Sequence, residues 1–273
     1  MPAMRDASFF GIDFTSAPSA RKPIRVAAGQ RQGGVVRLAG LEALGSLDAF
    51  SAWLTRPGPW VAGFDLPFGL PRELVETLGW PTGYAALMAH YAALSRAEIR
   101  DRFAAFCDAR PAGAKFAHRG CDGPAGASPS MKWVNPPVAW MLHAGVPRLI
   151  AAGVHLPGLL DGDPGRVALE TYPGLLAREL IARRSYKSDA RAAQTPERLI
   201  ARKDVVDALE QGRSRLGLRL KLSHAQRDAL VADASGDSLD AVLAMLQAAW
   251  AAGRPRYGWP EGVDPLEGWI ASA

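Results

Sequence analysis

The stretch SFFGIDFTSAP, residues 8–18, constrains the fold of this chain more than any other part of the sequence. Phe9, Phe10 and Ile12 are typical of a buried strand, and the apolar run ends at Asp13. Burying a carboxylate is costly unless a partner or a bound ion compensates its charge. The sequence therefore predicts a strand whose last residue pairs with another group or binds one.

Hydrophobic periodicity in the rest of the chain predicts an α/β layered sheet. Gly33-Gly34 is a hairpin turn signal between two strands, Pro173 is expected at the start of a helix, and Ser223 is expected to cap another. Gly and Pro concentrate between residues 110 and 170, which predicts long ordered loops there. In chain order, strands are predicted at 8–14, 23–30, 33–40, 60–65 and 167–169, and helices within 41–54, 72–106, 173–181, 182–213, 225–232 and from about 237 onward.

Composition limits the class of protein. The 273 residues are 48% hydrophobic and 22% charged, which is ordinary for a globular chain. No run reaches the roughly 18 apolar residues of a membrane helix, and MPAMRDASFF lacks the features of a signal peptide. We therefore expect a cytoplasmic protein with no membrane partner. Cys107 and Cys121 have no metal-binding spacing, so we expect reduced thiols rather than a zinc site.

The basic charge is unevenly distributed along the chain. The formal net charge is +5, and residues 178–203 alone hold eight basic and three acidic residues. Such a cluster suits a polyanion such as nucleic acid. A solvated helix surface explains the charge at least as well.

Several acidic residues lie at positions where an apolar segment of the sequence ends or begins next to a predicted turn. If the strands that end in Asp13 and Asp65 are parallel neighbours, the two side chains lie at one edge of the sheet. Close carboxylates repel one another, and hard divalent cations such as Mg²⁺ remove that repulsion. Two such ions about 4 Å apart can activate water in phosphodiester cleavage. The further acids at such junctions are Glu170, at the end of the last strand, and Asp233, Asp237 and Asp240, around the start of the final helix.

Each acid taken singly also has a structural explanation. Asp65 can bond the backbone in the turn before Pro67, and Glu170 can pair with a nearby arginine. Asp237 can cap the final helix, and the negative charge of Asp240 can interact favourably with the dipole of that helix. Asp13 is the hardest to explain in this way, because it ends the most apolar strand.

Four segments, taken in order, resemble the predicted ribonuclease-H-like nucleases of the family called domain of unknown function 429. They are GIDFTSAP, FDLPFGLP, ETYPGLL and DSLDAVLAMLQAAWAA. The last is also similar to the C-terminal D-x-x-D-A helix of Holliday junction resolvases, which share the ribonuclease H fold. The resemblance extends from about residue 8 to 251. It implies a single ribonuclease H-like domain over 1–273, with a mixed five-stranded sheet, helices on both faces and a helical and loop insertion at about 71–165.

The resemblance also implies a set of site residues. The metal-binding acids of the first strand, the fourth strand and the last helix correspond to Asp13, Asp65 and Asp240, with Asp237 as a further ligand candidate. Glu170 falls in a Glu-x-x-Pro-like motif that lines the site. The implied metal is Mg²⁺ or Mn²⁺. After Asp13 the sequence departs from the shorter Gly-containing turn of many relatives.

Polar and basic side chains near these motifs are candidates for contact with nucleic acid. Lys187 is a further catalytic candidate, because it can contact a phosphate or stabilise charge on the cleaved one. For Arg198 and Arg202, four residues apart, a solvated helix face is an equal alternative. Trp133 and Trp140 can stack on bases or pack the insertion. The substrate-binding candidates are Thr15, Ser16, Arg110, Lys115, Arg119, Lys132, Arg198 and Arg202.

The leading hypothesis is a metal-dependent phosphodiesterase or nuclease acting on DNA or RNA. A phosphotransferase of the actin and sugar-kinase type has a related core, but no Walker-type loop or repeated core occurs in the sequence. A non-catalytic nucleic-acid-binding protein is the third hypothesis, and carboxylates on its binding face argue against it. The choice between endo- and exo-cleavage, a small phosphorylated metabolite as substrate, and the oligomeric state are left open by the sequence.

Overall fold

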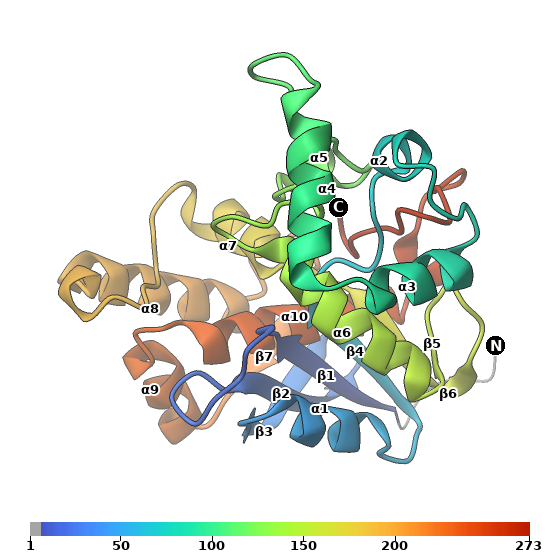
Figure 1. Cartoon of the computed structure of the whole chain (residues 1–273). Coiled ribbons are helices and arrows are strands. Elements are labelled where there is room, and N and C mark those ends of the chain that lie inside the picture. The colour runs from blue at the N-terminus through green and yellow to red at the C-terminus, as the bar shows by residue number, and fades with distance from the viewer. Residues whose placement is uncertain (1–6) are drawn as a thin grey trace.

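A mixed sheet of seven strands forms the centre of the computed structural model, which describes residues 7–273 (Figure 1). The strands lie in the order β5-β6-β4-β1-β2-β3-β7. β1 is parallel to β4 and antiparallel to β2, and β2 turns back into β3 through Gly33, whose φ is +59°. The strands are β1 (Ser8–Asp13), β2 (Ile24–Gln32), β3 (Val35–Leu44), β4 (Trp60–Asp65), β5 (Val154–His155), β6 (Asp163–Glu170) and β7 (Arg219–Lys221).

The predicted α/β class with a mixed sheet is confirmed, but the predicted number of five strands is wrong. Five of the strands, β1, β2, β3, β4 and β6, correspond to the predicted ones. The other two, β5 and β7, are two and three residues long and lie at the edges of the sheet. In β7 only Leu220 is buried, between Arg219 and Lys221, so the strand is too short for its alternation to be recognised.

The helices largely follow the predicted pattern. Pro173 opens α7, and Ser223 caps α9 by accepting a hydrogen bond from the Gln226 amide at 3.2 Å. The helices are α1 (Leu47–Leu54), α2 (Arg72–Thr77), α3 (Tyr84–Ala93), α4 (Arg96–Asp108), α5 (Asp122–Ala125), α6 (Val138–Ala151), α7 (Pro173–Ile181), α8 (Pro196–Glu210), α9 (His224–Ala232) and α10 (Asp237–Ala251), with 3-10 turns η1 (Arg191–Ala193) and η2 (Pro255–Gly258).

Two local predictions are wrong. Residues 41–44 belong to β3, and the helix starts only after Ser46, which accepts a hydrogen bond from the Ala49 amide at 3.0 Å. The loops predicted between 110 and 170 contain α6, a helix of 14 residues that accommodates Pro147. The high glycine and proline content of this region therefore led to a wrong prediction of loops where α6 forms. The apolar face of α6 packs on the core.

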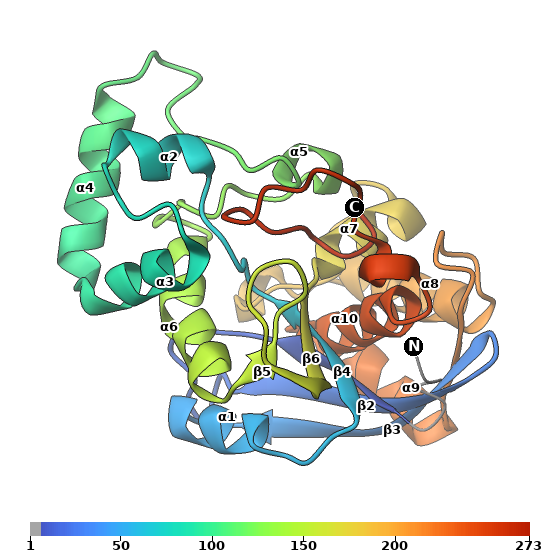
Figure 2. The same ribbon diagram turned by 90° about the vertical axis from the view of Figure 1, so that its right-hand side faces the viewer.

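Helices cover both faces of the sheet (Figure 2). On one face, Phe10 and Ile12 share a buried cluster with α1, α3, α4 and α6, so the insertion packs onto the sheet. On the other face, Phe9 belongs to a cluster with α7, α8, α9 and α10. Alternate residues of β1 thus face opposite layers, as the pleat of a strand requires.

Three expectations from the sequence concern membrane-spanning helices, the two cysteines and a signal peptide. Across residues 7–273, no helix is long and apolar enough to cross a membrane. Cys107, in α4, and Cys121, just before α5, are both buried and carry no disulfide. The expectation that no signal peptide is present rests mainly on residues 1–6, which lie outside the described residues.

Two glycines let α10 lie directly against the sheet. Gly11 of β1 and Gly63 of β4 are paired in register. A Cβ atom at Gly11 would lie 1.9 Å from the Ala241 carbonyl oxygen, and one at Gly63 would lie 2.4 Å from that of Ala244. Both strands therefore approach the helix backbone more closely than any side chain allows. Since side chains alternate along a strand, the residues two positions further on face the same helix.

Gly63→Ala is expected to lower the free energy of unfolding by about 1–3 kcal/mol, because α10 must shift to admit the methyl group. Gly40→Ala in β3 is the matched control, since nothing lies within 4 Å of a Cβ atom there, and its effect should stay below about 0.5 kcal/mol. Urea unfolding followed by tryptophan fluorescence measures both. Equal unfolding midpoints for the two variants would contradict the close contact.

Candidate metal centre

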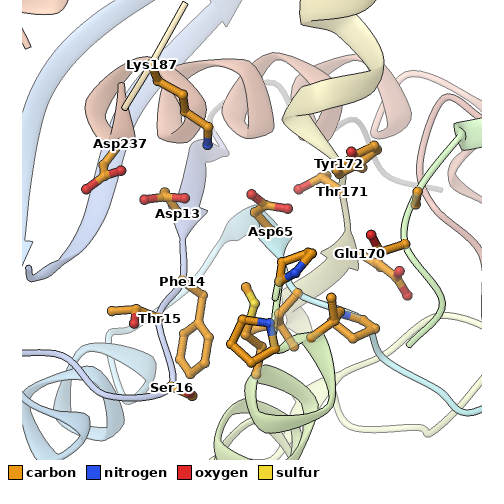
Figure 3. Close-up of a pocket in the computed structure, with 18 of the residues that line it drawn as sticks. Asp13, Phe14, Thr15, Ser16, Asp65, Glu170, Thr171, Tyr172, Lys187 and Asp237 are labelled. Carbon is orange, nitrogen blue, oxygen red and sulfur yellow. The ribbon is translucent and has the colours of Figure 1, made fainter. Parts of the chain in front are cut away.

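Three aspartates meet where β1, β4 and the start of α10 come together. Asp13 and Asp65 are paired in register on parallel strands, so their carboxylates lie side by side (Figure 3). Asp240 is in the first turn of α10, which the glycine contacts hold close to both strands. One carboxylate oxygen of each residue lies within 4.8 Å of the others. The structure thus brings together the three acids that the sequence assigns to a metal.

The two strand-end carboxylates are held in an unfavourable environment. Burial raises the pKa of Asp13 well above its usual range, and the charge of Asp240 adds to the shift. The same two causes raise the pKa of Asp65 to about 7. Lys187 opposes both shifts without cancelling them. Within residues 7–273, neither carboxylate has a salt bridge shorter than 4 Å, so their charges are left uncompensated by direct contact.

Asp240, in contrast, has a partner for each oxygen. The Tyr186 hydroxyl donates to one oxygen, and the Lys187 ammonium pairs with the other. Asp240 is fully buried, and Lys187 extends toward Asp13 (Figure 3). One ammonium therefore serves three carboxylates. A divalent cation would supply the missing positive charge, and oxygen ligands of this kind suit Mg²⁺ or Mn²⁺.

Glu170 lies at the end of β6 but stands outside the three-acid cluster. Its two oxygens accept hydrogen bonds from Arg119 at 2.7 and 2.8 Å, and one also accepts from the Phe68 amide at 2.9 Å. Arg119 bonds Asp122 as well, at 2.9 Å. Glu170 therefore pairs with an arginine, but the partner is Arg119 of the insertion and not one of the arginines near Glu170 in the sequence. The structure thus places Arg119, a candidate for phosphate contact, in a buried ion pair with its side chain only 1% exposed.

The start of α10 differs from the prediction. Asp237 is the first residue of the helix rather than its cap, and the N-cap position is Gly236, whose φ is +77°. The Asp233 carboxylate accepts from the Ser238 amide at 3.0 Å and so takes over the capping role. The pKa of Asp237 is raised by burial. Asp237 is close enough to line the same cavity as Asp13, but it is not one of the three clustered acids.

A cavity of about 550 Å³ opens beside the acids, between the sheet edge and the insertion. Thr15 and Ser16, predicted as substrate contacts, line it next to Asp13 (Figure 3). Lys22, which the sequence reasoning did not select, lines it too and pairs with Asp189. The other polar or charged lining residues are Asp65, Arg119, Ser128, Glu170, Thr171, Tyr172, Lys187, Ser188, Asp189, Ser235 and Asp237.

The remaining basic candidates lie away from this cavity. Arg110 pairs with Glu73 and covers the Phe106 ring, and Lys115 faces Asp108 at 3.6 Å. Lys132 and Arg198 are half-buried residues that do not line the cavity. Their assignment to substrate binding has no support from their position.

Arg202 fits neither its assignment to substrate binding nor the alternative of a solvated helix face. It is buried, and it donates to the carbonyl oxygens of Tyr186 at 2.7 Å and Val231 at 2.8 Å. Arg202 thus fixes the backbone of Tyr186, whose hydroxyl holds Asp240. Sequence reasoning missed Tyr186. Its only signal is an aromatic residue beside Lys187 in an otherwise polar segment.

Comparison with protein-family models, curated protein sequences and solved structures finds no match for this chain. The side chains of the site themselves indicate its chemistry. Converging carboxylates with too little positive charge can hold a cation, and the cation in turn can bind an anion. The Lys187 ammonium and the hydroxyls of Thr15 and Ser16 can donate hydrogen bonds to that anion. This combination suits a phosphate ester.

The pH dependence of stability tests the uncompensated acids. The folded protein holds a proton on Asp65 up to about pH 7, whereas unfolded aspartate releases it near pH 4. The resulting stabilisation is complete below about pH 4 and is lost as the pH rises to about 7. In EDTA, the free energy of unfolding should fall between pH 5 and pH 8, and it should fall less in Asp65→Asn. The exposed Asp161→Asn is the control; an unchanged fall in Asp65→Asn would refute the raised pKa.

Removing the arginine of the buried ion pair tests the structural role of Glu170. Arg119→Met should lower the free energy of unfolding by about 3–5 kcal/mol, because it leaves Glu170 and Asp122 buried without a counter-charge. Arg100→Met removes only an exposed pair with Asp101 and should have little effect. Chemical denaturation of both variants at pH 7 gives the comparison. A stability loss for Arg119→Met as small as that of the control would argue against the pair as a structural element.

Proposed function

We propose that this chain is a divalent-metal-dependent phosphodiester hydrolase of the ribonuclease H-like kind that acts on nucleic acid. The observation that carries the proposal is the meeting of Asp13, Asp65 and Asp240 within 4.8 Å at the edge of a mixed sheet. These acids come from the first strand, the fourth strand and the last helix, the positions that the resemblance to the domain of unknown function 429 implies. Cytoplasmic location belongs to the same proposal.

The residues present fit the implied metal. Asp13 and Asp65 offer carboxylates without a direct partner among the described residues, and Asp240 is held in place by Tyr186 and Lys187. These three acids would hold Mg²⁺ or Mn²⁺, and Asp237 lies nearby on the cavity wall. When bound, the metal supplies Lewis-acid polarisation of the phosphate and a lowered pKa of water.

The chain itself contributes positioning and charge. Lys187 lines the cavity with a partly exposed side chain, so its ammonium can bind an oxygen of the scissile phosphate. Thr15 and Ser16 present hydroxyls beside Asp13. Without a cation, the charges of Asp13 and Asp65 repel a phosphate group. Substrate binding is therefore expected to depend on the metal, which disfavours a simple nucleic-acid-binding protein.

Asp13→Asn is expected to remove both metal binding and activity. Millimolar Mn²⁺ should raise the melting temperature of the wild-type protein, because a ligand that binds only the folded state stabilises it. The variant should show no such rise, and its cleavage of labelled DNA and RNA oligonucleotides should fall to background. Differential scanning fluorimetry and gel-based cleavage assays provide the two readings.

The exposed Asp101→Asn serves as the matched control for this substitution. It should keep both the Mn²⁺-induced rise in melting temperature and the cleavage rate of the wild type. Mn²⁺-dependent cleavage by Asp13→Asn at the wild-type rate would contradict the proposed metal centre.

A further inference from the structure

The cavity beside the acids has a second, apolar wall that metal binding leaves unexplained. It begins one residue beyond each strand-end acid, with Phe14 after Asp13 and Leu66 after Asp65. The insertion and the C-terminal segment complete it. Its other apolar lining residues include Pro136, Pro137, Val138 and Met141.

The chemistry of this wall limits what can lie against it. A phosphate or a solvated sugar would lose hydration there without gaining hydrogen bonds. A nucleobase has apolar faces and favours such a surface. The group attached next to the scissile phosphate is therefore expected to be a base rather than a second phosphate.

One polar atom of the cavity lacks a partner. Thr171 is 2% exposed, lines the cavity, and has a hydroxyl oxygen without a hydrogen bond to any described residue. Figure 3 shows it beside Asp65, between that acid and Tyr172. Buried hydroxyls normally have partners, and less than 1 Å² of the Thr171 hydroxyl oxygen is exposed, so it would have to turn toward the cavity to pair with a polar group of a ligand. A nucleotide placed with its phosphate at the acids can offer that group.

The volume of the cavity favours single-stranded over double-stranded nucleic acid. About 550 Å³ is the volume of a site for one small-molecule-sized group. A base within a duplex is stacked and paired, and it reaches such a site only after extrusion, which costs free energy. A base in a single strand can enter without that cost.

We propose that this apolar wall is a subsite for one nucleobase adjacent to the scissile phosphate, so that the substrate is single-stranded nucleic acid. The inference rests on the proposed phosphodiester hydrolase function. Pro137, Val138 and Met141, which are at least partly exposed, form the surface for the base, and the Thr171 hydroxyl, turned toward the cavity, donates a hydrogen bond to the same nucleotide. The three aspartates and Lys187 lie at its phosphate.

The test compares three oligonucleotides in Mn²⁺: a single strand, its blunt duplex, and the same single strand with abasic residues. The single strand should be cleaved about 10-fold or more faster than the other two. Cleavage of the duplex or of the abasic strand at the same rate overturns the base subsite and leaves the hydrolase proposal standing. Cleavage of none of the three overturns the hydrolase proposal and the subsite with it.

Met141→Trp, which fills the apolar wall, is expected to raise the KM for the single strand about 10-fold. Its Mn²⁺-induced melting shift should stay as in the wild type, because the acids are untouched. Val134→Trp adds the same ring on an exposed residue outside the cavity lining and should leave KM unchanged. A Met141→Trp variant that folds and keeps the wild-type KM overturns the subsite.

Thr171→Val gives a test that does not depend on the fold of Met141→Trp. Removing an unpaired buried hydroxyl should leave the melting temperature equal or higher. Affinity for a fluorescein-labelled single strand, measured by anisotropy in Ca²⁺, should fall about 3- to 10-fold, the equivalent of one hydrogen bond. Thr171→Ser keeps the hydroxyl and should bind as the wild type does. Equal affinity of Thr171→Val and wild type overturns the role of Thr171 in the subsite.

Discussion

Helix α10 lies against β1 and β4 at a distance that only glycine permits, and the geometry of the site follows from that contact. Gly11 and Gly63 are paired in register, as are Asp13 and Asp65 two residues later. The two strands thus repeat a Gly-x-Asp pattern on one face of the sheet. Gly11 and Gly63 contact the backbone of α10. Asp13 and Asp65 therefore lie beside the first turn of this helix, which contains Asp240. A larger residue at either glycine would lift Asp240 away from the strand ends.

The fold holds these carboxylates together against their mutual repulsion. Burial and neighbouring charge raise the pKa of Asp13 and Asp65, so the metal-free site favours protonated acids. Lys187 and Tyr186 contact Asp240 directly, and the Lys187 charge lowers the pKa of Asp13 and Asp65 without offsetting the effect of their burial. Arg119 neutralises Glu170 in a separate buried pair. Arrangements of this kind persist only where surrounding packing determines them, and they concentrate at functional sites. A divalent cation at the cluster would remove the repulsion that the packing imposes.

Sequence periodicity predicts most of the architecture, because strands and helices bury regular faces. It predicts the β2–β3 hairpin, strands that end at Asp13 and Asp65, and the final helix, but it leaves open whether those two strands are parallel neighbours, which the structure shows. It misses β5 and β7, which are too short for a pattern, and α6, which contains Pro147. Tertiary contacts are also beyond its reach. The Arg119–Glu170 pair joins residues 51 positions apart, and the capping of α10 by Asp233 depends on the loop conformation around Gly236.

The central claim is that Asp13, Asp65 and Asp240 form one metal centre. A crystal structure of the protein grown with Mn²⁺, with anomalous diffraction recorded at the manganese edge, tests this most directly. A shared metal centre predicts an anomalous peak bound by carboxylate oxygens of all three residues at about 2.0–2.2 Å, near the distance that hard divalent cations adopt. An empty cluster under saturating Mn²⁺, or an ion held elsewhere, would contradict it.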